Sequence, residues 1–133
     1  MTNVSKRQLS GTDYKSAYEQ LLLLISNLNN KTAPTFIDEL FTEAEKIMIV
    51  KRFAAAVLFN QNYTSYRVSI AIGISESTAQ RLYKKYCEGE FDKLLNCLSK
   101  KQKSEFVSLI EDFILSKASP RARARFVNRV TKL

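Results

Sequence analysis

Apolar side chains recur at helical spacing along most of this chain. The first such row predicts a helix over residues 13–30. Leu23 and Leu24 widen its apolar stripe, so the helix should be buried on more than one side. The polar cluster with Pro34 (29–34) should end it, and a short second helix is expected at 36–41. The row consists of Tyr14, Tyr18, Leu21, Leu22, Ile25 and Leu28.

Two capping boxes predict where later helices begin. In 42–45, Thr42 and Glu45 can cap each other and open a helix that runs to about Asn60. Ser99 and Gln102 have the same spacing and open another helix, after a short amphipathic one at 91–98. The expected inner face of the first is Ile47, Val50, Phe53, Ala54, Val57 and Leu58, and that of the second is Phe106, Leu109, Ile110, Phe113 and Ile114.

The stretch at 65–86 reads as a helix-turn-helix. Gly73 stands where the first helix must end, since glycine adopts the left-handed conformation easily. Ser75 can cap the second helix, which Gly89 should close, and Ser69 is small where the helices approach. Their mutual core is expected from Val68, Ile72, Ile74, Ala79 and Leu82.

The outward face of the second helix suits DNA. It has no acidic residue between Glu76 and Glu88. Glu76 stands at the start of the helix, where a negative charge interacts favourably with the helix dipole. Ser77, Thr78 and Arg81 are the expected base-reading residues. The alternative is a helical corner that never touches DNA. The side chains expected on the DNA backbone are Tyr66, Arg67, Gln80, Lys84 and Lys85.

Composition favours an all-α multi-helix bundle. Only 3 Gly and 2 Pro occur in 133 residues, and no apolar/polar alternation predicts a strand. We expect a flexible arm at 1–12, a helical domain at 13–117, and a basic tail or short helix at 118–133.

The charge of +8 favours a polyanionic partner. Six basic residues and no acidic one lie in 117–133. The alternatives for this tail are a solvating end or a helix on an anionic membrane surface. The tail residues expected to contact phosphates are Arg121, Arg123, Arg125 and Arg129.

Little in the sequence suggests catalysis or a cofactor. With 0 His, the two cysteines, Cys87 and Cys97, cannot form an ordinary zinc site, and we expect both to be buried free thiols. No nucleophile motif or phosphate loop is present. We therefore expect no catalytic residue, metal or cofactor, no membrane association, and a bacterial cytoplasmic, nucleoid-associated location.

Several motifs within 36–98 resemble the Trp repressor superfamily. They are the run Leu40–Glu45, the pair Lys51-Arg52, the residues Tyr63 and Ser65, Ile72–Ser75, and Thr78–Arg81. The most specific part is the spacing of Thr42, Arg52 and Arg81. The resemblance implies an intertwined homodimer that binds operator DNA in successive major grooves.

The resemblance also implies an effector pocket at Thr42, Arg52 and Arg81, because the matching arginines hold tryptophan in the responsive members. Here Leu82 replaces a glycine that makes room for the ligand, and Lys85 replaces a small hydroxyl residue. Tryptophan is therefore not the expected ligand, and the identity of any effector stays open.

Taken together, the sequence predicts a sequence-specific regulator of transcription that binds double-stranded DNA as a homodimer. One alternative is a DNA- or RNA-binding protein without sequence preference, which relies on the basic surface and tail. The other is a helical adaptor that binds proteins.

Overall fold

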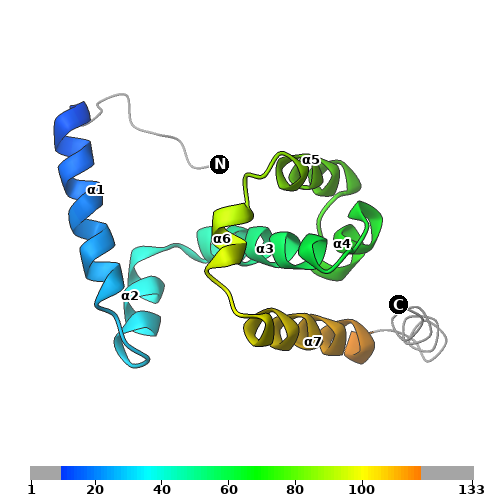
Figure 1. The fold of residues 1–133 in the computed structure, drawn as a ribbon. Helices are drawn as coiled ribbons and strands as arrows, with labels where there is room; N and C mark the ends of the chain where they lie inside the picture. The colour runs from blue at the N-terminus through cyan, green and yellow to red at the C-terminus, as the bar shows by residue number, and fades with distance from the viewer. Residues whose placement is uncertain (1–9, 118–133) are drawn as a thin grey trace. The chain divides into compact units, whose positions relative to one another are not determined.

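The computed structural model of the chain describes residues 10–117, and Figure 1 shows them as an all-helical fold. The prediction of an all-α protein is confirmed for this part of the chain, which contains no strand. The seven helices are α1 (Gly11–Ser26), α2 (Thr32–Leu40), α3 (Glu43–Asn60), α4 (Ser65–Ile72), α5 (Glu76–Cys87), α6 (Asp92–Asn96) and α7 (Lys100–Lys117).

The chain divides into two compact units, the first ending at Glu45 and the second beginning at Lys46. The first unit contains α1 and α2, and the second contains α4 to α7. Helix α3 begins in the first unit and places most of its length in the second. The predicted arm at 1–12 overlaps α1, which already begins at Gly11; residues 1–9 and the predicted tail at 118–133 lie outside the described residues.

In the first unit, α1 ends earlier than the sequence predicts. The side chain of Asn27 donates to the carbonyl of Leu23 at 3.0 Å, which caps the helix well before residue 30. The prediction that the polar cluster at 29–34 ends the first helix is also wrong in part, because that cluster overlaps the start of α2. Asn29 Oδ1 accepts from the amides of Lys31 and Thr32, so α2 starts at Thr32. Pro34 then falls in the first turn, where its missing N–H is not needed.

Helix α3 begins at the predicted capping box and ends at the predicted Asn60. The amide of Thr42 donates to Glu45 Oε1 at 2.9 Å, and the amide of Glu45 donates to Thr42 Oγ1 at 3.2 Å. These hydrogen bonds lower the pKa of Glu45. They satisfy two amides that helix geometry would leave unpaired.

The inner face of α3 is only partly where the sequence predicts it. Ala54–Phe59 is buried on every side, but Ile47 and Val50 are 53% and 56% exposed. They are not part of the core of the second unit, whose helices surround α3 only from Phe53 onward.

The core of the second unit gathers around the C-terminal half of α3. One cluster joins Leu58 and Phe59 to Val68 of α4 and Ile110 of α7. Another joins Val57 to Phe91 and to Leu95 of α6. Leu82 and Tyr86 of α5 pack against both clusters, and α4 lies against α5 and α7 (Figure 1). This packing fixes the α4–α5 pair on a buried framework.

The later helices begin as predicted. The amide of Ser99 donates to Gln102 Oε1 at 2.9 Å and the amide of Gln102 to Ser99 Oγ at 3.1 Å, which caps α7. On α7, Ile110 is buried and Phe106 packs against the core, whereas Leu109 and Phe113 remain about half exposed. The face of α7 that packs against the core is therefore narrower than the sequence predicts.

The prediction for the cysteines is half wrong. Cys87 and Cys97 are free, but both are exposed. Cys87 follows Tyr86, which points to the core, and one residue turns a helix by about 100°. Cys97 comes directly after α6, beyond its buried Leu95.

Candidate nucleic-acid interface

Helices α4 and α5 are joined by a short turn whose caps follow the sequence pattern. Thr64 Oγ1 accepts from the amide of Arg67 at 3.2 Å and begins α4. Gly73 ends it with φ 66° and ψ 48°, the left-handed conformation. Ser75 Oγ then accepts from the amide of Thr78 at 3.1 Å and begins α5.

The two helices meet through small and branched side chains. Val68 and Ala79 have no exposed surface, and Ser69 is 8% exposed. The Ser69 hydroxyl donates to the carbonyl of Tyr66 at 2.6 Å, which satisfies it within its own helix. The predicted partners Ile72, Ile74 and Leu82 are half-buried against the same core.

Lys51 ties this turn to α3, a contact that the sequence pattern does not predict. Its Nζ donates to the carbonyl of Gly73 at 2.9 Å. A cation at the C-terminal end of a helix interacts favourably with the partial negative charge of the last carbonyls. Lys51 thus ties the C-terminal end of α4 to α3.

The face of α5 away from the core carries the predicted contact residues. Ser77, Gln80, Arg81, Lys84 and Lys85 are exposed, while Thr78 is half-buried. Two of the three predicted base-reading residues, Thr78 and Arg81, are joined by a hydrogen bond. The Thr78 Oγ1 atom accepts from Ser75 Oγ at 2.8 Å and from Arg81 Nη2 at 3.2 Å.

Of the two contact residues predicted on α4, only Tyr66 is open to solvent, at 56% exposure. The Arg67 guanidinium lies over the ring of Tyr63, 4.4 Å from its centroid, and one of its nitrogens is buried without a hydrogen-bond partner. The Tyr63 hydroxyl donates to Glu111 Oε1 at 2.9 Å. Burial and this hydrogen bond raise the pKa of Tyr63. Arg67 therefore belongs to a cluster that links α4 to α7.

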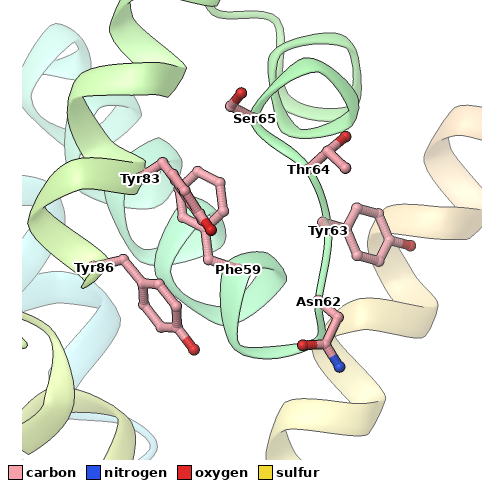
Figure 2. Close-up of a pocket in the computed structure, with 7 residues that line it drawn as sticks. All are labelled: Phe59, Asn62, Tyr63, Thr64, Ser65, Tyr83 and Tyr86. Atoms are coloured by element: carbon pink, nitrogen blue, oxygen red, sulfur yellow. The ribbon is translucent and has the colours of Figure 1, made fainter.

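The structure gives separate roles to the three residues implied as an effector pocket. Thr42 is engaged in the cap of α3, Arg52 is exposed, and Arg81 bonds to Thr78. A cavity of about 370 Å³ lies elsewhere, and none of the three lines it. Its lining, drawn in Figure 2, is Phe59, Asn62, Tyr63, Thr64, Ser65, Tyr83 and Tyr86.

Aromatic rings form one wall of this cavity. The centroid of the Phe59 ring lies 5.2 Å from that of Tyr83 and 5.8 Å from that of Tyr86, and the centroids of the two tyrosine rings are 6.4 Å apart. A hydrogen bond with Cys87 raises the pKa of Tyr83. On the other side, Asn62 is the one described non-glycine residue with a positive φ, at 66°.

Across residues 10–117, no group of three or more Cys, Asp or Glu side chains could hold a metal ion. Among the same residues, no helix is long and apolar enough to cross a membrane. Comparison with protein-family models, with curated proteins and with solved structures gave no match.

Sequence reasoning missed Lys51, the Tyr63–Glu111 bond and the aromatic cavity. The contacts of Lys51 and Glu111 join residues far apart in sequence, and nothing in the local pattern marks them. The sequence does hold a signal for the cavity: Tyr83 and Tyr86 lie three residues apart on one helix, and Phe59 and Tyr63 lie four apart at the end of another.

Proposed function

We propose that this chain is a sequence-specific DNA-binding regulator of transcription, with α4 and α5 as a helix-turn-helix and α5 in the major groove. The observation that carries the proposal is the α5 face: exposed hydroxyl, amide and cationic side chains on a helix whose opposite side is fixed to the core by Ala79. An α-helix fits the major groove, where base edges can be distinguished.

Arg81 is the main base reader in this proposal. Arginine recognises guanine through two parallel hydrogen bonds, and its orientation decides whether both form. The Thr78 oxygen accepts a bond from Arg81 and limits its freedom. That oxygen also accepts from Ser75, so Thr78 retains its hydroxyl hydrogen to donate to a base.

In this proposal, the cations at the end of α5 and Tyr66 contact the DNA backbone. Lys84 and Lys85 are exposed in its last turn, and Tyr66 is exposed on α4. Arg67 contributes through its cluster with Tyr63 instead, because its guanidinium is already stacked and partly buried. The tail arginines add sequence-independent affinity in proportion to the phosphates they neutralise.

We also propose that the regulator acts as a homodimer. Each unit, taken by itself, leaves a run of apolar side chains exposed: Leu22–Ile25 of α1 in the first and Ile47–Val50 of α3 in the second. Apolar surface on this scale is typical of association sites. A second copy suits a DNA-binding head, since dimers read two half-sites about 34–36 Å apart.

The dimer is tested by sedimentation of the full chain. Leu24 is 58% exposed, so Leu24→Gln should fold normally yet shift the protein toward the monomer. Glu19→Gln, an exposed polar substitution on the same helix, is the matched control and should leave the dimer intact. A wild-type monomer at every concentration would contradict the proposal.

The strongest competing function is nucleic-acid binding without sequence preference, favoured by the charge of +8. Selection from a random duplex library, followed by titration of recovered and scrambled duplexes, separates the two. We expect Arg81→Ala to weaken binding to the recovered duplex by about tenfold or more and to spare the scrambled one.

Lys101→Ala is the control, because it removes one exposed positive charge from α7, away from the proposed face. It should affect both duplexes equally and weakly. Equal wild-type affinity for recovered and scrambled duplexes would refute sequence-specific binding.

A further inference from the structure

The cavity beside α5 has a lining suited to binding a flat molecule. Tyr83 and Tyr86 extend from α5 toward the end of α3, where Phe59 lies behind Tyr83 (Figure 2). Phe59 is 2% exposed and holds its ring within 6 Å of both tyrosines. Rings fixed in this way offer a rigid apolar surface to a stacking partner.

The charge pattern decides which flat molecules fit. None of the lining residues is a carboxylate, lysine or arginine, and the two charged groups that contact Tyr63, Arg67 and Glu111, are already engaged with it, so an ion would find no charged lining residue of opposite sign. Tyrosine rings can bind cations, but here Arg67 already covers the Tyr63 ring and the chain carries +8. A neutral molecule is therefore favoured.

The opposite side of the cavity supplies polar groups. Asn62 and Thr64 lie in the segment between α3 and α4, and Ser65 is the first residue of α4 (Figure 2). Asn62 is exposed and keeps a left-handed backbone that most side chains avoid. Its amide offers both a donor and an acceptor, which suits a ring with a polar edge.

We propose that this cavity binds a neutral planar heteroaromatic molecule of one or two rings, stacked on Tyr83 and Tyr86 and hydrogen-bonded at the Asn62 edge. A volume of about 370 Å³ is near the lower end for small-molecule sites, which limits the ligand to this size. The site is separate from the α5 face that we propose for DNA, and it does not depend on DNA binding.

Nitrogen-15 chemical-shift mapping of the full chain, without DNA, tests the site with five probes. Adenosine and indole are neutral and planar; choline is a cation, benzoate a planar anion and cyclohexanol a neutral non-planar ring. We expect adenosine or indole to shift the amides of Asn62, Thr64 and Ser65 with a Kd below about 1 mM. The other three probes should bind at least about tenfold more weakly.

Two variants locate the ligand. Tyr83→Leu keeps an apolar side chain but removes the ring, and should weaken binding about three- to tenfold. Asn62→Gly tolerates the same backbone conformation and removes the whole side chain, its amide included, so it should also weaken binding. Tyr14→Leu, on the exposed surface of α1, is the control and should bind as the wild type does.

A nucleobase could come from a free molecule or from a single strand, and a short oligodeoxyadenosine distinguishes these sources. If the oligonucleotide binds more tightly than adenosine or indole and Tyr83→Leu abolishes that advantage, the site is supported and its natural ligand is a base of a single strand. Tighter binding of adenosine or indole supports the site for a free ligand. The proposal is overturned if no probe shifts the lining amides, if choline or benzoate binds as tightly, or if Tyr83→Leu binds as the wild type does.

Discussion

Gly73→Ala should destabilise the second unit through the backbone alone. Gly73 has φ 66° and ψ 48°, and a Cβ atom built there would meet only Lys51 Nζ, at 4.0 Å. Since no clash occurs, the cost is that of placing an alanine in the left-handed region, about 1–2 kcal/mol. For a domain of this size, each kcal/mol lowers Tm by roughly 4–8 °C.

Urea denaturation, monitored by circular dichroism, measures the change in the free energy of unfolding. Two variants serve as controls. Gly73→Asn should lose less stability, because asparagine adopts the left-handed conformation more readily. Gly11→Ala lies in the first turn of α1 with open space around the added methyl group, and should be neutral or slightly stabilising. Equal stability of Gly73→Ala and the wild type would refute the capping role of Gly73.

Three further predictions concern pH, capping and salt. Tyr63→Phe should cost about 1–3 kcal/mol at neutral pH, because Glu111 loses its donor. Since the pKa of Tyr63 is raised above its ordinary 10.0, that stabilisation is complete below pH 10 and is lost as the pH rises; denaturation at pH 7 and above pH 10 should show the difference narrowing. Thr42→Ala should cost about 0.5–2 kcal/mol near pH 7. The Thr42 amide, which alanine keeps, and the Thr42 hydroxyl both lower the pKa of Glu45, so only the part of the loss that comes from the hydroxyl and the carboxylate should disappear in melts well below pH 4.5. Deleting 118–133 should weaken binding to all duplexes and reduce the salt slope by about 0.9 for each phosphate that the tail neutralises; an unchanged slope would exclude the tail from binding.

Local patterns predicted the ends of several elements because their causes are local. Thr42 with Glu45 and Ser99 with Gln102 lie three residues apart and bond to each other's amides. Gly73 is glycine because the turn needs a positive φ. Where two local signals competed, the prediction failed. Pro34 looked like a helix breaker, but Asn29 starts α2 early enough for Pro34 to fall in its first turn.

Burial was harder to predict than helicity. Periodicity placed Ile47 and Val50 on the inner face of α3, but it cannot say where along a helix its partners begin or whether they come from the same chain. The cysteines failed for a related reason. Each stands next to an apolar position at the end of its helix, where a small rotation decides between core and solvent.

The candidate site was predictable only where it is built from neighbouring residues. The exposed face of α5 follows from the helical period once Ala79 is placed in the core. The bond from Lys51 to Gly73 spans 22 residues, and that from Tyr63 to Glu111 spans 48. Such contacts depend on how α3, α4 and α7 pack, which no local spacing encodes.

Methylation interference on the duplex recovered by selection tests the central claim most directly. Methyl groups at guanine N7 lie in the major groove, whereas those at adenine N3 lie in the minor groove. If Arg81 and its neighbours on α5 read the major groove, guanine N7 methylation should block binding at two sites one helical turn apart. Interference only from adenine N3, or from neither base, would contradict the placement of α5.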